Sequence, residues 1–330
     1  MKVLITGGAG FIGSHVAQHC LDKGYDIVVI DDLSGGFVEN LADGGQRYLG
    51  SICDQRLVAE IFSTHKFDYV YHLAAYAAEG LSHFIRPFNY WNNLTGSVNL
   101  INQAIKHEVK RFVFTSSMAV YGEGNPPFKE TDPLGPEDPY GVAKWAVERD
   151  LFVAKKMFDL DYTIIRPHNV YGPNQHIWDR YRNVAGIFMN QIVQGKPLTI
   201  FGDGSQKRSF SYISDIAPHI ASAPEMESTK GQTYNLGSSE VTTVKELASA
   251  CCRAMGVEED FQYWPSRYEV KNAYSDQSKS SETFGPPMVG LEEGLKYFAE
   301  WVKAVPMRPA SKVMRPDIEK NLPDVWKRYL

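Results

Sequence analysis

The chain has 330 residues, of which 43% are hydrophobic and 22% charged, and a formal net charge of -5. Its length is large for one hydrophobic core, so we expect a large domain with a smaller companion. The acidic balance and the lack of a lysine or arginine block argue against nucleic acid as a partner. No stretch approaches the ~20 apolar residues that cross a bilayer, so a membrane is not an expected partner either.

The four cysteines, at positions 20, 53, 251 and 252, show neither CxxC spacing nor the density of a disulfide scaffold. We expect reduced thiols. The first residues enter a strand at once instead of forming a targeting segment, which favours a cytoplasmic location. His15 and His19 stand one helical turn apart with no third ligand in sight, so no metal site is predicted.

A glycine-rich turn follows the first predicted strand, residues 1–6, and precedes a predicted helix over residues 14–23. Its sequence is Gly7-Gly-Ala-Gly10-Phe-Ile-Gly13. Gly7 permits the tight turn, Gly10 lets the backbone approach a pyrophosphate, and Gly13 lets helix and strand pack closely. Amides at the helix N-terminus would face the anion. The pattern predicts a dinucleotide site.

A carboxylate supports that interpretation. The second predicted strand, residues 27–30, ends in Asp31, roughly 20 residues after the glycine turn, where an acidic side chain binds the adenosine ribose hydroxyls. Asp31 would repel a 2′-phosphate, and no arginine follows it in Asp32-Leu-Ser-Gly-Gly. NAD is therefore favoured over NADP.

Strand and helix patterns keep alternating through the first half of the chain. Strands are predicted near Tyr48 and over 69–73, 111–115 and 162–165, and helices over 55–63, about 93–107 and around Tyr140. This order predicts an α/β fold, a Rossmann-type doubly wound parallel sheet. The motifs would meet at its carboxyl edge, where ligands bind in such sheets.

Glycine and proline punctuation loosens the pattern after about Pro167. We therefore predict an NAD-binding domain over 1–166, to which some later segments return, and a smaller mixed α/β substrate-binding domain with a C-terminal tail over 167–330. The tail beyond Pro306, with Pro309, Pro316 and Pro323, is expected to wrap over the body as loop and short helix.

Tyr140 and Lys144 lie four residues apart in a predicted helix, so their side chains share a face. An unperturbed phenol titrates near ~10, and an adjacent ammonium would favour its ionised form. The pair is typical of a prepared general base. A serine pair, Ser116 and Ser117, precedes them at the end of an apolar run.

Together these motifs resemble the extended short-chain dehydrogenase/reductases of the NAD-dependent nucleotide-sugar epimerase/dehydratase family, in character nearest to UDP-glucose 4-epimerase-like proteins. The resemblance runs from Met1 to about Leu295. It rests on the glycine turn, His-Leu-Ala-Ala at 72–75, Asn92-Asn93, Ser116-Ser117 before Val120-Tyr-Gly, Tyr140 with Lys144, and Arg166-Pro-His-Asn169-Val-Tyr-Gly.

The resemblance implies residue roles. Tyr140 would be the catalytic base, Lys144 would bind the nicotinamide ribose and lower the pKa of Tyr140, and Ser117 would bond the substrate hydroxyl. The substrate nucleotide would be held by Asn169, Arg208 and, with weaker correspondence, Arg267. The implied cofactor-binding residues are Gly7, Gly10, Phe11, Ile12, Gly13, Asp31, Asp32, Ser51, Ile52, Leu73, Ala74, Ala75, Tyr76, Asn93, Ser116, Tyr140, Lys144 and Pro167.

The implied reaction is a 4-epimerisation of a nucleotide sugar through a transient 4-keto sugar, with a UDP-sugar of the glucose/galactose, uronate or N-acetyl type as substrate. Dehydratases of this family carry an Asp-Glu pair after the catalytic Thr or Ser, where this chain has Met118 and Ala119. Dehydration or decarboxylation stays an alternative, because Glu79 or Glu123 can substitute if they are not simply solvated loop carboxylates. A non-catalytic NAD sensor or scaffold is the alternative of another class.

Some positions depart from the family pattern. Ser51 stands where relatives place an aspartate against the adenine, and Pro167-His168 replaces an aromatic pair. His168 either touches substrate or packs within its loop. Ala273 or Tyr274 occupies the position that limits the group on sugar carbon 2. The resemblance also implies a homodimer formed through the helices near 93–107 and 139–157.

Overall fold

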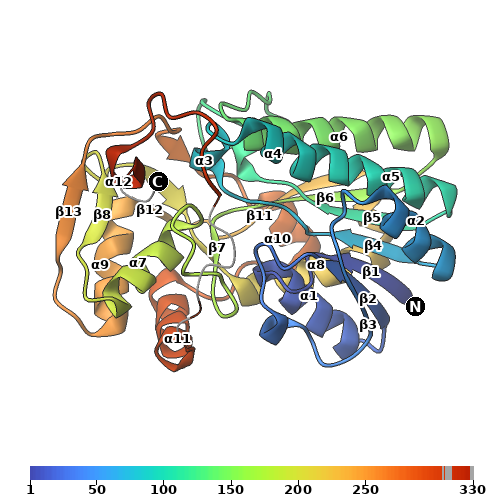
Figure 1. The fold of residues 1–330 in the computed structure, drawn as a ribbon, viewed down its shortest axis with the longest axis horizontal. Coiled ribbons are helices and arrows are strands. Elements are labelled where there is room, and N and C mark those ends of the chain that lie inside the picture. Colours follow the sequence, from blue (N-terminus) through green and yellow to red (C-terminus); the bar gives the residue numbers. More distant parts are fainter. Residues whose placement is uncertain (307, 309–313, 328–330) are drawn as a thin grey trace.

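A seven-stranded parallel sheet forms the larger part of the computed structural model, which describes residues 1–306, 308 and 314–327 (Figure 1). Its strand order is β11-β6-β5-β4-β1-β2-β3. The strands are β1 (Lys2–Thr6), β2 (Asp26–Asp31), β3 (Gln46–Leu49), β4 (Tyr69–His72), β5 (Arg111–Thr115), β6 (Tyr162–Pro167) and β11 (Gln232–Leu236). The order reverses between β1 and β4, which confirms the predicted doubly wound sheet.

Helices cover both faces of this sheet (Figure 1). One face packs against α2 (Gln55–Thr64), α5 (Gly96–Lys106) and α6 (Pro139–Phe158), through buried side chains such as Val58, Leu100 and Val147. The other packs against α1 (Phe11–Asp22) and α8 (Ala217–Ser222), through Val16 and Ile220 among others. The central strands are buried on both faces, as their apolar sequences require.

Shorter elements connect β4 to α5. They are α3 (Glu79–Ser82), α4 (Arg86–Tyr90) and a π-helical turn (Trp91–Thr95). The segment 78–82, which contains Glu79, thus includes the helical turn α3. Ser82 stabilises this turn by donating from Oγ to the Glu79 carbonyl. This turn packs against the start of α6 and lies at the carboxyl edge of the sheet.

The second half of the chain builds a smaller mixed region beside that edge (Figure 1). Its strands are β7 (Val170–Tyr171), β8 (Leu198–Phe201), β9 (Lys207–Ser209), β10 (Ser211–Tyr212), β12 (Val241–Thr243), β13 (Phe261–Trp264) and β14 (Asn272–Ala273). Its helices are α7 (Val184–Val193), α9 (Val244–Met255) and α11 (Leu291–Ala304), whereas α10 (Ser278–Phe284) packs on β11 of the large sheet. A core of its own, around Phe188, Leu247 and Phe298, joins α7, α9 and α11.

The C-terminal segment contacts both parts of the molecule, through Phe84 of the larger part and Arg267 of the smaller region. Its short helix α12 (Asp324–Lys327) places Trp326 in an apolar cluster with Leu81 and Tyr181. The tail is thus loop and short helix over the body, as expected, although Pro309 lies outside the described residues. Among the helices of the described ranges, none is long and apolar enough to span a membrane.

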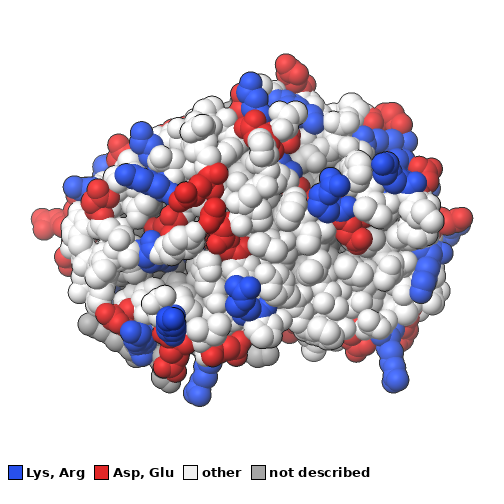
Figure 2. All heavy atoms as spheres, turned by 90° about the horizontal axis from the view of Figure 1, so that it is seen from above, with Lys and Arg blue, Asp and Glu red and all other residues white. Residues whose placement is uncertain are grey.

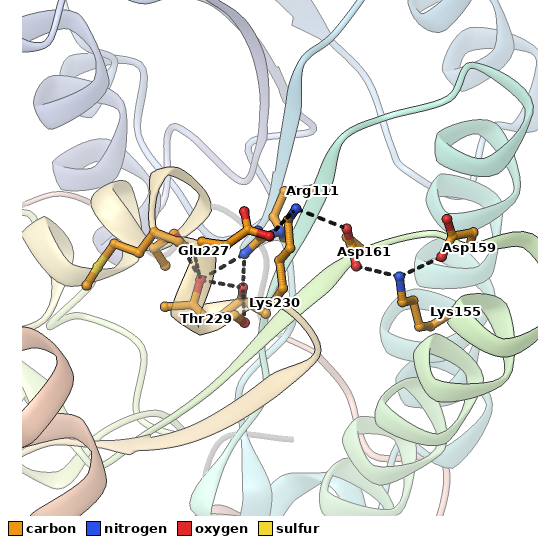
Figure 3. A network of polar contacts seen from close by, with 10 residues as sticks. Arg111, Lys155, Asp159, Asp161, Glu227, Thr229 and Lys230 are labelled. Carbon is orange, nitrogen blue, oxygen red and sulfur yellow. Dashed lines mark hydrogen bonds and ion pairs between the residues drawn. The ribbon is translucent and has the colours of Figure 1, made fainter.

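Polar contacts tie strands together at the opposite, amino edge of the sheet (Figure 3). The buried Arg111 donates from Nη1 to the hydroxyls of Thr163 (3.1 Å) and Thr229 (2.8 Å). Asp161, just before β6, forms an ion pair with Lys155 at 2.7 Å and lies 3.9 Å from Lys230. These contacts hold β5, β6 and the segment before β11 in register, far from the edge that carries the motifs.

On the face drawn in Figure 2, acidic and basic side chains are interspersed instead of forming one basic surface, in keeping with the net charge of -5.

Candidate active site

A cavity of about 480 Å³ lies at the carboxyl edge of the large sheet, between it and the smaller region. The ends of β1, β2, β4, β5 and β6 all contribute to its wall. Every residue predicted for the cofactor, the substrate or catalysis lines this cavity except Tyr76 and Asn93. The parallel sheet thus brings together side chains that lie up to 260 residues apart, from Gly7 to Arg267.

The glycine turn fits a dinucleotide. Gly7 has φ +75°, and a Cβ on Gly13 would lie only 2.0 Å from the Gly7 carbonyl oxygen. Because only glycine permits this close turn, α1 starts directly above the end of β1. Gly10 precedes the helix and has no side chain to cap its first amides, which leaves them available to an anion such as a diphosphate.

Asp31 stands at the end of β2 beside that turn. Its carboxylate accepts hydrogen bonds from the backbone amides of Ala9 (2.9 Å) and Leu33 (2.8 Å). Burial raises the pKa of Asp31, and these amides oppose the rise. Its position on the cavity wall is the one expected of a ribose-binding carboxylate, with Asp32 and Ser51 lining the same end.

Ser117, Tyr140 and Lys144 converge on one side of the cavity. Ser117 follows β5, and its Oγ accepts from the Ala119 amide at 3.1 Å. Tyr140 and Lys144 come from the first turns of α6, which Asp138 caps by accepting from the Gly141 amide at 2.9 Å. Lys144 Nζ donates to the Thr115 carbonyl at 2.7 Å and lies 5.8 Å from the Tyr140 ring centroid.

Burial dominates the electrostatics of Tyr140 and Lys144. Burial raises the pKa of the Tyr140 phenol, and the interaction that most opposes the rise is a hydrogen bond with Ser117. Burial lowers the pKa of Lys144 itself to about 7, because its nearest carboxylate, Glu148, offsets only part of the desolvation. The hydrogen bond with Ser117 favours the ionised phenol, while burial keeps the pKa of Tyr140 above its usual value.

A buried ion pair connects β6 to α6, the helix that carries Tyr140. Arg166 of β6 donates to both carboxylate oxygens of Glu148 of α6, at 2.9 and 2.6 Å. Ser116 donates to the same carboxylate, and Arg166 also donates to the Tyr121 hydroxyl at 2.7 Å. Both charged side chains are almost fully enclosed. This network fixes α6 relative to β5 and β6, and so the spacing of Tyr140 and Ser117.

The predicted substrate arginines lie at the far end of the cavity. Arg267 pairs with Glu269 at 3.0 Å and stacks 4.6 Å from the Phe201 ring centroid. Arg208 donates to the carbonyls of Lys271 and Val270 and lies 3.9 Å from Glu269. Asn169 lines the same wall and donates to the Ser209 carbonyl at 3.0 Å. Glu269, which we did not predict, lies next to both guanidinium groups at the cavity. Its place two residues after Arg267 is the one feature of the sequence that could have indicated this pairing.

Glu79, one of the two candidates to substitute for the missing acid–base pair, lines the cavity from the start of α3. Its side chain is open to solvent through the cavity. Burial nevertheless raises its pKa, and Arg208 opposes the rise. Burial and then the charge of Glu79 raise the pKa of the neighbouring Asp138 to about 8. Both carboxyl groups line the same cavity as Tyr140 and the two arginines.

Three side chains lie away from the cavity. Asn93 accepts from the Tyr76 amide (2.8 Å) and donates to the Tyr76 carbonyl (3.1 Å). Its side chain therefore holds the backbone of Tyr76 in place and does not reach the cavity. Tyr76 packs against Phe88. His168 is fully buried and bonds Ser275 at 2.7 Å, which identifies it as a packed loop histidine.

Sequence reasoning also missed the segment 175–183, which supplies Gln175, His176, Arg180, Tyr181, Arg182 and Asn183 to the cavity. It follows the recognisable Asn169-Val-Tyr-Gly motif but has no local pattern of its own. Only the basic residues Arg180 and Arg182 hinted at an anion.

Known proteins share this architecture. Residues 3–237 match the model of the NAD dependent epimerase/dehydratase family. UDP-glucose 4-epimerase of Mycolicibacterium smegmatis is 32% identical over 312 residues, which are 92% of this chain and 99% of the relative. The structure of UDP-glucose 4-epimerase from Thermotoga maritima with UDP-glucose is 36% identical, with a TM-score of 0.88, and covers 92% of this chain and 99% of its own.

The UDP-glucose 4-epimerase of Thermus thermophilus in complex with NAD is similar over the same shares of both chains, at 30% identity and a TM-score of 0.87. These findings confirm the predicted Rossmann-type fold and NAD as the cofactor. This chain therefore belongs to the NAD dependent epimerase/dehydratase family.

Proposed function

We propose that this chain is an NAD-dependent nucleotide-sugar 4-epimerase, an isomerase, with a UDP-sugar as substrate. The observation that carries the proposal is the convergence of Ser117, Tyr140 and Lys144 on a cavity that also holds the glycine turn and two arginines. A sensor or scaffold needs the glycine turn but has no use for the serine, tyrosine and lysine at its nicotinamide end. The relatives named above support a substrate of the UDP-glucose type.

The residues of the cavity have different roles in the proposed reaction. Bound NAD supplies the hydride acceptor and, in the second half of the reaction, the hydride donor. Tyr140, hydrogen-bonded to Ser117, takes the proton from the hydroxyl on sugar carbon 4 and returns it after the keto sugar has turned over. Arg208 and Arg267 anchor the nucleotide diphosphate, so the sugar rotates while the nucleotide stays bound. There is no net oxidation.

The positions after Ser117 favour epimerisation over dehydration. Met118 is buried and Ala119 carries no acid or base, so elimination of water lacks its usual pair of groups there. Dehydration or decarboxylation stays the alternative reaction to test, because the Glu79 carboxylate lines the cavity near Tyr140.

The first prediction follows from this chemistry. Incubation with UDP-glucose is expected to give a mixture of UDP-glucose and UDP-galactose, without accumulation of NADH, measured by anion-exchange chromatography and absorbance at 340 nm. UDP-glucuronate and the N-acetyl sugars extend the test. A deoxy-keto sugar would instead show a dehydratase, and a pentose from UDP-glucuronate a decarboxylase. A protein that binds NAD but converts none of them would contradict the proposal.

We also infer a homodimer formed through α5 and α6. One side of α6 exposes large apolar side chains, with Val153 53%, Met157 72% and Phe158 58% exposed. Phe152 and Trp145 of the same helix are also exposed, at 39% and 37%. Such a group of apolar side chains at helical spacing is typical of an interface between subunits.

The second prediction tests this interface. Met157→Glu is expected to convert a dimer into a monomer in light scattering, because a buried unpaired carboxylate opposes association. Met288→Glu, at an exposed methionine away from α6, is the control and should leave the dimer intact. A wild-type monomer at micromolar concentration would contradict the inference.

A cytoplasmic location remains part of the proposal. The four cysteines are free thiols in the structure, and those at 20, 251 and 252 are buried. Free thiols are what a reducing compartment maintains.

A further inference from the structure

Segment 174–183 of the smaller region packs on the loop that follows β2. Asn40 donates from Nδ2 to the Asn174 carbonyl at 3.0 Å. The Phe37 ring lies 4.7 Å from that of His176 and 5.6 Å from that of Trp178, centroid to centroid. The segment therefore covers the part of the cavity lined by the glycine turn and by Ser34 and Gly35.

Arg182, near the end of this segment, lies across the cavity. Its Nε donates to Asp179 Oδ2 at 2.9 Å, and its guanidinium carbon lies 5.1 Å from the centroid of the Tyr76 ring. On the other side, a Cβ built on Gly35 would lie 2.2 Å from Arg182 Nη2. Both members of the Arg182–Asp179 pair are mostly enclosed.

The loop that carries Gly35 places this guanidinium beside the glycine turn. Gly35 follows β2 and Tyr76 follows β4, and β1 lies between these two strands. Gly36, the residue after Gly35, packs on the glycine turn, because a Cβ built on it would lie 2.3 Å from the Ala9 carbonyl oxygen and 2.7 Å from the Gly10 amide nitrogen. The turn from Gly7 to Gly13 begins at the end of β1, and there the dinucleotide diphosphate binds in this fold.

The turn itself supplies only neutral backbone donors. Two carboxylates, Asp31 and Asp32, stand at the neighbouring strand end, and the loop from Asp32 to Gly36 holds no cation. A doubly charged diphosphate would thus lack a positive partner from its own βαβ unit. The arginine fork matches phosphate oxygens, and Asp179 keeps its orientation.

We propose that Arg182 binds the diphosphate of NAD and, with segment 174–183, closes the cofactor site from the side of the smaller region. Gly35 leaves the space that this arginine occupies. A cofactor held in this way stays bound through repeated turnovers, which an epimerase needs because it must return the same hydride. The inference rests on NAD as cofactor and is independent of which sugar is used.

The third prediction is a loss of affinity specific to the diphosphate. Arg182→Met is expected to weaken binding of NAD and of ADP-ribose by about 10- to 100-fold, since a charge-assisted contact is lost. Adenosine, which has no phosphate, should bind as it does to the wild type. Affinities are measured by calorimetry on cofactor-free protein, and the NAD content of freshly purified protein by an enzymatic cycling assay on an acid extract.

Arg253→Met is the matched control, because Arg253 also forms an ion pair with an acidic residue but lies on α9 away from the cavity. It should retain NAD at the wild-type level. Arg182→Lys keeps the charge without the fork and is expected to lose less affinity than the methionine variant. If the methionine variant does not fold, the lysine variant gives the same comparison of ADP-ribose with adenosine.

Unchanged affinity of the Arg182 variants for ADP-ribose would overturn the inference. So would weaker binding of UDP with unchanged NAD, because Arg182 would then belong to the substrate diphosphate. Neither result depends on epimerase activity. A protein that binds NAD through Arg182 but does not epimerise UDP-sugars would contradict the proposed function alone.

Discussion

Replacing Tyr140 with phenylalanine is expected to lower kcat for the epimerisation of the UDP-sugar by about 100- to 10,000-fold. The variant removes the only atom of this side chain that can take the proton from the sugar hydroxyl, while the ring stays to fill its buried position. The NAD content of the purified protein should not change, because the glycine turn and Asp31 are untouched. Steady-state kinetics test the expected loss of kcat, and NAD quantification tests the unchanged cofactor content.

Tyr263→Phe, at a half-exposed tyrosine of β13, is the control for the chemical change. It should have wild-type kcat. Undiminished activity of Tyr140→Phe would refute the assigned base, and loss of NAD from that variant would show that Tyr140 serves binding more than proton transfer.

Glu148→Ala is expected to lower the free energy of unfolding by about 3–5 kcal/mol. It leaves the Arg166 guanidinium buried without its carboxylate, and it also removes the partner of Ser116. Urea unfolding followed by fluorescence gives the change. Because the pair fixes α6 against β6, we expect weaker activity even where the variant is folded.

Glu225→Ala provides the matched control. Glu225 pairs with Lys23 on the surface, with both side chains about one third exposed, so its loss should cost at most about 1 kcal/mol. Replacing Glu148 and Arg166 together by Leu and Met should recover part of the stability, since no unpaired charge remains. Equal stability of Glu148→Ala and Glu225→Ala would contradict a structural role for the buried pair.

Residues in local motifs were predictable because their function depends on neighbours in the chain. Gly7, Gly10 and Gly13 are set by one strand, turn and helix, and Asp31 follows from the end of the next strand. Tyr140 and Lys144 share a helix face at i and i+4. For these residues the period of the secondary structure already decides which side chains lie together.

Other features depended on long-range packing. A pattern of spacing does not contain the desolvation that lowers the pKa of Lys144, or the hydrogen bond between Ser117 and Tyr140. Asn93 belongs to a matching motif and Tyr76 follows one, yet neither side chain lines the cavity. Glu79 became a cavity residue only because α3 docks against the start of α6.

Local patterns are enough to predict the parallel α/β fold, the dinucleotide turn, the NAD preference and the serine, tyrosine and lysine of the proposed chemistry, because each rests on local geometry. The tertiary structure alone decided which charges meet across the cavity. Arg182 lies 147 positions after Gly35 in the chain but reaches it in space, since the smaller region folds back over β2. Contacts of that kind depend on how distant elements pack, and no periodicity in the chain records them.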